Sequence, residues 1–226
     1  DGKTIRRPEY VPTGENKRAH KAAHVVSAWA HSLGVCFGQV KTEEKSNEIT
    51  AIPELLDLLE LKGMSVTIDA MGCQKKIVEK IAEKEAEYVI SLKGNQQSIH
   101  RDVKEFFEHP CDDAYCQYYN IQRGEYTIEI GHGRIEKRTC YLCSNIDWLL
   151  EKDEWANLNG VGMLVCERTV KKTGKKSVEQ RYFLTSLTDV HKAAFAMRAH
   201  WGIENNLHWV LDAILDEDYC LVRKDN

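Results

Sequence analysis

Apolar residues recur at three- and four-residue steps between His191 and Asp218, the spacing that keeps side chains on one face of a helix. The stripe consists of Ala196, Ala199, Ile203, Leu207, Val210, Leu211 and Ile214. One long amphipathic helix is therefore predicted over 191–218. A second line of polar side chains follows at four-residue steps beside the stripe, namely His200, Glu204, His208 and Asp212. This line is either a solvated helix face or one wall of a site at the edge of the core.

The pattern before residue 110 alternates between the strand and the helix period. Strands are predicted at 24–30 and 35–41, as a hairpin, and at 64–68 and 88–92. Helices are predicted at 47–61, 74–85 and 98–107. The strand at 64–68 is almost continuously apolar and stops at Asp69, as buried parallel strands do. Because ligands often lie beyond the carboxyl ends of such strands, Asp69 is a candidate site residue; the alternative is a cap for the helix that follows.

Short alternating segments between Cys111 and Leu187 favour antiparallel strands. These strands are predicted at 115–122, 126–130, 134–143, 161–170 and 180–186, with a helix at 148–155 and a basic hairpin tip at 171–176. Residues 6–21 mix turn formers with cations, which predicts a basic loop. We therefore expect an α/β segment over 1–110, a β-rich insertion over 111–187 and a closing helix within 188–226.

Composition narrows the class of protein. With 226 residues, 42% hydrophobic and 29% charged, the chain is expected to be one large soluble domain, or a domain with an insertion. No apolar run approaches the ~20 residues that span a bilayer and no signal peptide is visible, so we expect no membrane partner and a cytoplasmic location. The eight cysteines are accordingly expected to be reduced. The net charge of -4 argues against a free-standing nucleic-acid binder.

Three acids lie at the ends of predicted elements or on a predicted helix: Asp1 at the start of the β-hairpin system, Asp69 at the end of a parallel-type strand and Glu204 on the helix after the β-rich insertion. That order resembles the DDE transposases. The sequence motifs around the acids are similar to those of the H-repeat-associated, insertion-sequence transposases of bacteria. They are DGKTIR at 1–6, TIDAMGCQ at 67–74, SLKGNQ at 91–96, HGRIEKR at 132–138 and RAHWGIENNLHWVLD at 198–212. The resemblance covers essentially the whole chain, and five ordered motifs are specific together.

The resemblance implies an RNase H-like α/β fold, a mixed sheet flanked by helices, with a β-rich insertion before the final catalytic helix. It also implies metal-dependent phosphodiester cleavage and strand transfer at insertion-sequence ends. Asp1, Asp69 and Glu204 would be the catalytic residues and would hold two Mg²⁺ or Mn²⁺ ions, since these ions prefer oxygen ligands. The implied partner is DNA, both transposon ends and target, with a homodimer on paired ends. The alternative is a catalytically silent, transposase-derived DNA-binding or interaction protein.

Further residues take roles by position. The candidate DNA-binding residues are Lys93, Asn95, His132, Arg134, His200 and His208. The two histidines beside Glu204 are expected either to orient it or to contact the scissile phosphate. Trp201 and Trp209 are expected in the core.

Two other expectations concern metal. A zinc site at Cys140 and Cys143, with Cys111 and Cys116 nearby, is disfavoured by the irregular spacing. A free α-amino group on Asp1 would be cationic and would oppose the proposed ions. The resemblance implies a longer protein, with a segment before the first aspartate and a tail after the final helix. A basic flanking region outside this chain would account for the acidic net charge.

Overall fold

The computed structural model describes residues 1–5, 23–42, 48–109, 112–124, 127–131 and 133–217. The chain divides into two compact units. Unit 1 contains residues 1–60 and 199–226, and unit 2 contains residues 61–198. Within the described ranges, none of the helices has the length and apolar character that a membrane crossing requires.

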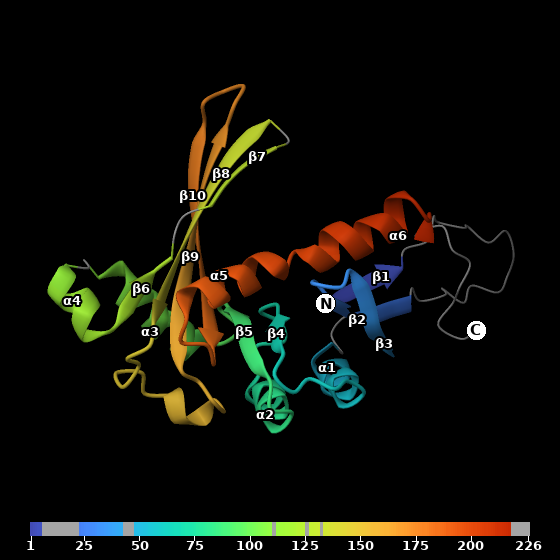
Figure 1. The fold of residues 1–226 in the computed structure, drawn as a ribbon, viewed down its shortest axis with the longest axis horizontal. Helices are drawn as coiled ribbons and strands as arrows, with labels where there is room; N and C mark the ends of the chain where they lie inside the picture. Colours follow the sequence, from blue (N-terminus) through green and yellow to red (C-terminus); the bar gives the residue numbers. More distant parts are fainter. Residues whose placement is uncertain (6–22, 43–47, 110–111, 125–126, 132, 218–226) are drawn as a thin grey trace, which may run out of the picture. The chain divides into compact units, whose positions relative to one another are not determined.

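Unit 1 contains an antiparallel sheet of three strands in the order β1–β2–β3, with the helix α1 packed against it (Figure 1). The elements are β1 (Gly2–Ile5), β2 (Ala23–Ala30), β3 (Val35–Thr42) and α1 (Glu48–Asp57). The predicted hairpin is confirmed, and Gly34 has a φ of 65°, the left-handed conformation that a glycine adopts readily. The predicted helix over 47–61 is also confirmed, although it ends at Asp57.

A buried polar pair joins α1 to the sheet of unit 1. His24 Nε2 and Glu48 Oε1 are 2.7 Å apart and both side chains are almost fully buried, while Thr4 Oγ1 lies 2.9 Å from His24 Nδ1. A Cβ atom at Gly2 would overlap the carboxylate of Glu48. Only glycine therefore lets β1 pass this close to the pair, and the contact fixes the position of the neighbouring Asp1.

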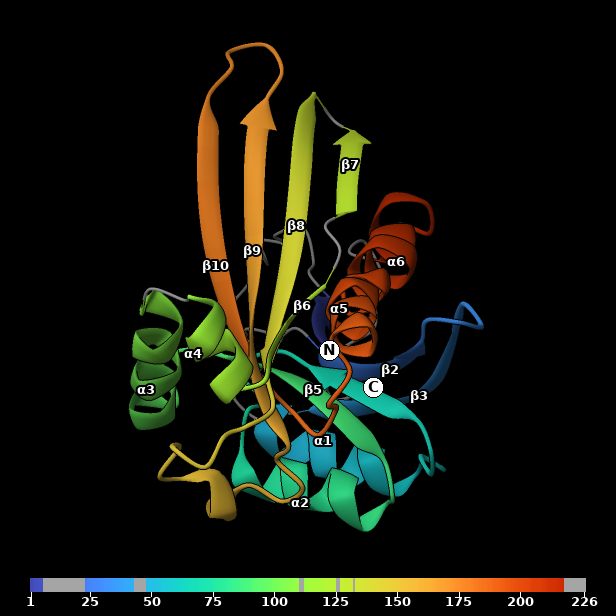
Figure 2. The same cartoon turned by 60° about the vertical axis from the view of Figure 1, so that its left-hand side comes forward.

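Unit 2 is built on a mixed sheet of seven strands in the order β4–β5–β10–β9–β8–β6, with β7 paired to β8. Its strands are β4 (Ser65–Ile68), β5 (Glu87–Leu92), β6 (Ile121–Arg123), β7 (Thr127–Gly131), β8 (Arg134–Cys143), β9 (Gly160–Val170) and β10 (Lys176–Thr185). The first two strands are parallel and the other pairs are antiparallel. Figure 2 shows β8, β9 and β10 running side by side, extended well past the helices. The expected mixed α/β class is confirmed.

The helices of unit 2 are α2 (Lys75–Glu83), α3 (Gln97–Glu108), α4 (Asp113–Tyr118) and α5 (Val190–Ala199), together with the 3₁₀ turn η2 (Lys152–Glu154). The core lies between α5 and the inner halves of the long strands. Val190, Ala193, Ala196 and Met197 of α5 pack with residues from the central strands, including Cys140, Leu142, Leu164 and Phe183. The alanines on this helix face allow the helix to approach the sheet closely.

Two predicted elements are wrong. Residues 115–122 were predicted as a strand, whereas α4 occupies 113–118 and β6 begins only at Ile121. The aspartate before the helix explains the difference, because Asp112 Oδ1 accepts a hydrogen bond of 2.8 Å from the Tyr115 amide and caps the helix. The ring of Tyr115 then packs against Phe106 of α3. The predicted helix over 148–155 is reduced to the 3₁₀ turn η2.

The cysteines differ from expectation at one position. Cys36, Cys73, Cys140, Cys143 and Cys166 are free thiols. Cys116 is disulfide-bonded, so the expectation of reduced cysteines is wrong there.

Candidate metal centre

The predicted long helix over 191–218 is interrupted. Helix α5 ends at Ala199, a turn follows at His200 and Trp201, and helical backbone resumes at Gly202. A Cβ atom at Gly202 would lie 2.6 Å from Nδ1 of the exposed His31, so a larger residue there would have to displace this side chain at the end of β2. The continuous four-residue line of polar side chains that was predicted from His200 onward is therefore broken at its first member.

A wide turn of backbone carries the central acid. Glu204–His208 form the π-helix η3, which continues into α6 (Trp209–Ala213). Single π turns inside helices often occur at functional sites. This turn buries His208 and Ile203 but leaves Trp201 43% and Trp209 59% exposed. The prediction that both tryptophans lie in the core is wrong, because the turn directs the smaller apolar residues inward instead.

Asp1, Glu204 and His208 form the candidate centre. One ligand atom from each of the three side chains lies within 4.8 Å of the other two, close enough for one ion to bind all three. His208 Nδ1 lies 3.3 Å from Glu204 Oε2. The side chain of Asp1 is bound to the first residue of β1, since its Oδ1 accepts a hydrogen bond of 2.9 Å from the Gly2 amide. Its α-ammonium donates to the carbonyl of Ser27 in β2, at 2.9 Å.

The protonation states suit a divalent cation. Burial, together with the positive charges of the Asp1 α-ammonium and Lys3, lowers the pKa of His208 to about 4, against an opposing effect of Asp212 and Glu217. The imidazole is thus neutral at pH 7, as a metal ligand must be. Its Nε2 atom is buried without a hydrogen-bond partner among the described residues. Two carboxylates and a neutral imidazole form a donor set that suits Mn²⁺ and similar divalent ions.

Burial also raises the pKa of Glu204, and the negative charge of Asp212 acts in the same direction. The α-ammonium of Asp1 and the charge of Lys3 oppose this shift. The expected repulsion between that ammonium and a bound cation therefore has a geometric basis, because the charge acts on both Glu204 and His208.

Lys3 fastens the helical end of the centre to β1. Its Nζ atom lies 2.7 Å from Asp212 Oδ1 and 2.6 Å from Glu217 Oε2, and its side chain is only 9% exposed. Burial lowers the pKa of Lys3, but its bonds to the two carboxylates outweigh this effect and raise the pKa overall. Lys3 was not singled out from the sequence, because no local pattern signals an ion pair across two hundred residues.

His208 makes the stability of the protein depend on pH. Its folded pKa of about 4 lies below the ordinary value of 6.5, so the unfolded chain binds a proton first as the pH falls. The stabilisation is complete above about pH 6.5 and is lost progressively towards pH 4. From pH 7 to pH 5 we expect a loss of about 1–2 kcal/mol in the free energy of unfolding. Urea unfolding titrations at pH 7 and pH 5 measure this difference in the free energy of unfolding.

His208→Gln is the matched variant for this prediction, since glutamine is polar and does not titrate in this range. The difference between wild type and variant should shrink as the pH falls from 7 to 5. A constant difference would show that His208 is protonated equally in the folded and unfolded states.

Asp69 lies in unit 2, directly after β4, and is half-buried. Its Oδ1 accepts hydrogen bonds from the amides of Met71 (3.1 Å) and Gly72 (3.3 Å). Helix α2 begins later, after Gln74, with no side-chain cap bond. Asp69 therefore closes the turn after the strand, and the alternative of a helix cap is wrong.

The turn after β5 supports the turn that carries Asp69. Asn95 Nδ2 donates to the carbonyl of Ala70 at 2.6 Å, and Gln96 Nε2 donates to the carbonyl of Cys73 at 2.8 Å. Lys93, in the same turn, is exposed. The two predicted motifs at 67–74 and 91–96 are thus joined in space, and Asn95 has a structural contact besides its predicted role towards DNA.

The remaining candidates lie on other elements of the chain. His200 is half-buried in the turn after α5, and Arg134 begins β8. His132 lies outside the described residues.

The zinc alternative finds no support in the described part of the chain, where the one group of potential ligands of this kind contains no cysteine. Burial raises the pKa of Cys140 to about 12 and that of Cys143 to about 11, which disfavours the thiolates that zinc needs.

Comparison with known proteins adds an independent observation. The chain matches the family described as "Transposase DDE domain" over residues 1–226. It is 41% identical to "Putative transposase YncI" of Escherichia coli O157:H7 over 232 residues, which cover 100% of this chain and 56% of that protein. It is 39% identical to "H repeat-associated putative transposase YhhI" of Escherichia coli strain K12 over 231 residues, which cover 100% and 58%. The chain thus spans about half the length of the curated relatives it matches.

Among solved structures, the chain is similar to a piggyBac transposase in a synaptic complex with hairpin DNA. The TM-score is 0.47 and the identity 10%, with 100% of this chain and 41% of that chain covered. A similarity at this level carries no weight for the fold or the function.

Proposed function

The chain belongs to the family of transposase DDE domains, and we propose that it is the catalytic domain of a DNA transposase. The proposed reaction is metal-dependent phosphodiester cleavage and strand transfer at the ends of an insertion sequence. The observation that carries the proposal is the grouping of Asp1 and Glu204, two acids named from the family motifs, around the neutral His208.

The proposed catalytic residues are Asp1, Asp69 and Glu204. Bound Mg²⁺ or Mn²⁺ ions, two in the proposal, would lower the pKa of the attacking water and stabilise charge on the leaving oxygen. Asp1 and Glu204 would supply carboxylate ligands, and the neutral imidazole of His208 would supply a nitrogen ligand beside Glu204. The assignment of Asp69 to the same centre and the RNase H-like topology rest on the family resemblance. The proposed division into core, insertion and closing helix at 110 and 187 rests on the change of sequence pattern at those positions.

The proposed partner is DNA, contacted through Lys93, Asn95, His132, Arg134 and His200. His208 was also predicted as a DNA contact, but its side chain is buried, so it is not proposed for that role. Two copies of the protein would act on paired transposon ends. The proposed location is the cytoplasm.

Nicking of supercoiled plasmid tests the proposal. We expect nicked and linear products with Mn²⁺ or Mg²⁺ and none with excess chelator. The assay compares two forms of the protein, the chain beginning at Asp1 and a form with additional residues before Asp1. Because the Asp1 α-ammonium opposes bound cations, the longer form should be the more active. If both forms bind DNA but neither cleaves it with any divalent ion, the catalytic proposal fails and the silent DNA-binding alternative replaces it.

A further inference from the structure

The outer half of the long strands in unit 2 is strongly basic. We call residues 127–131, 133–138 and 165–181 the arm; they contain β7 and the outer halves of β8, β9 and β10 (Figure 2). The arm contains nine lysines and arginines against four glutamates, a surplus of five positive charges, whereas the whole chain carries -4. The positive charge is therefore concentrated on one projecting element.

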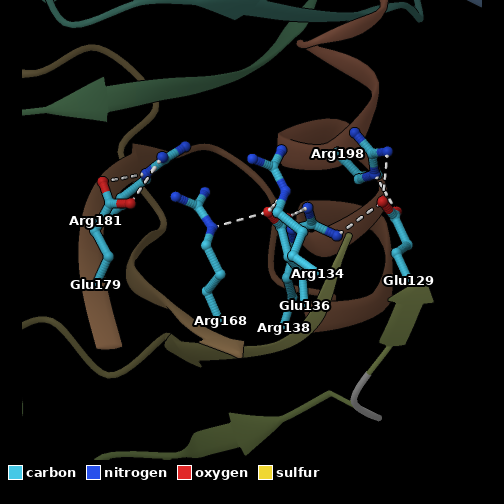
Figure 3. A network of polar contacts seen from close by, with 8 residues as sticks. All are labelled: Glu129, Arg134, Glu136, Arg138, Arg168, Glu179, Arg181 and Arg198. Carbon is cyan, nitrogen blue, oxygen red and sulfur yellow. Dashed lines mark hydrogen bonds and ion pairs between the residues drawn. The ribbon is translucent and has the colours of Figure 1, made fainter. Parts of the chain in front are cut away.

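Strand register places most of the arginines of the arm on one face. Glu136 of β8 lies directly opposite Glu129 of β7 and Arg168 of β9. Because alternate residues of a strand share a face, Arg134 and Arg138 lie on the same face as Glu136. Glu179 and Arg181 of β10 follow in the same way. This arginine face, defined by the residues of Figure 3, continues the sheet surface on which α5 packs.

Glutamates lie between the guanidinium groups of the arginine face and form ion pairs with them. Glu136 is 10% exposed and lies between three arginines, with Oε1 at 2.7 Å from Arg134 Nε and 2.9 Å from Arg168 Nε, and Oε2 against Arg138 (Figure 3). At the edge of the arginine face, Arg198 of α5 donates two hydrogen bonds to Glu129, from Nε to Oε1 at 2.7 Å and from Nη2 to Oε2 at 3.0 Å.

The arginine face keeps capacity for an anion. Figure 3 contains five guanidiniums and three carboxylates, and each guanidinium carries five N–H donors. The side chains of Arg134, Arg168 and Arg198 are 44%, 42% and 46% exposed. Donors that are both fixed by a carboxylate and open to solvent suit phosphate, which arginine binds through paired hydrogen bonds.

The opposite face of the arm differs in the kind of its cations. There, Lys137 is paired with Glu167 at 3.6 Å, Lys176 lies opposite Thr169 of β9, and the large apolar side chains of Ile130 and Val178 are exposed. The guanidiniums of the arm are therefore all on the arginine face, whereas the opposite face carries lysines and exposed apolar side chains.

We infer that the arginine face binds the phosphate backbone of duplex DNA, with Glu136 acting as an internal counter-ion that keeps three guanidiniums in position. The inference rests on the proposed function, because DNA is the proposed partner. It concerns binding and needs no metal, so it can be tested separately from cleavage.

The test is fluorescence anisotropy of the whole chain with a short labelled duplex of random sequence, in chelator, over a salt series. For Arg134→Ala/Arg168→Ala we expect affinity at low salt to fall about tenfold or more, and the slope of log K against log salt to become shallower by about 2. Lys137→Ala, on the opposite face of the same strands, should bind like wild type. Arg134→Lys/Arg168→Lys should keep most of the salt slope, which separates loss of charge from loss of folding.

Unchanged binding by the double alanine variant would overturn the inference. An equal loss in Lys137→Ala would also overturn it, because net charge and not the arginine face would then control binding. If the wild-type chain binds no duplex even at low salt, the arginine face is not a DNA surface, and the plasmid assay decides the proposed catalysis independently.

Discussion

Replacing Glu204 with glutamine is expected to reduce metal-dependent DNA cleavage by about a thousandfold or more. A metal ion contributes several kcal/mol of charge stabilisation in the transition state, and each 1.4 kcal/mol is a factor of ten in rate. Glutamine keeps the size of the side chain but removes the charge that the proposed ion binds. Calorimetric titration with Mn²⁺ should show weaker binding by the same variant, so binding and rate are measured independently.

Glu54→Gln is the matched control, since Glu54 is an exposed acid on α1 of the same unit. It should cleave DNA and bind Mn²⁺ like wild type. Asp69→Asn is expected to be as inactive as Glu204→Gln. If both acids serve one centre, the double variant should be scarcely worse than either single variant, because residues that act as a unit are non-additive. Additive losses would separate Asp69 from the centre, and full activity of Glu204→Gln would remove Glu204 from it.

Replacing Gly162 with alanine is expected to destabilise the protein by about 3 kcal/mol, the upper end of the usual cost of overpacking a core. Gly162 of β9 lies directly opposite Phe183 of β10, and an added Cβ would overlap the phenyl ring. Phe183 is fully buried in the cluster under α5 and has no space to retreat. Urea unfolding should show a lower midpoint.

Gly131→Ala provides the control for this substitution. Gly131 also lies in a strand of unit 2, but an added Cβ there meets no heavy atom within 4 Å. It should unfold at the wild-type midpoint or slightly above it. Similar midpoints for the two variants would mean that the ring of Phe183 can move aside.

The strands of unit 2 were the most predictable part of the fold. The strand predicted at 134–143 coincides with β8 at both ends. The strand predicted at 115–122 failed because its tyrosines favour a strand, whereas a capping bond from Asp112 stabilises a short helix there.

The candidate site was predictable only in part. Family motifs selected Asp1 and Glu204, and the structure places them together with His208. Lys3 was missed because its ion pairs join the two ends of the chain. The π turn at 204–208 was missed because its residues also fit an ordinary helix, and tertiary contacts determine which of the two forms.

The π turn makes segment length matter more than residue identity at its surface. Asn205 and Asn206 are exposed within it, so substitutions there should cost little. Deleting either residue would instead remove the extra residue that widens the turn, so the backbone would close as an ordinary helical turn. His208 would then follow Glu204 by three residues and no longer by four, which changes the geometry of the candidate centre. Among diverging copies of this sequence, we therefore expect substitutions at these two positions to be tolerated better than the loss of either codon.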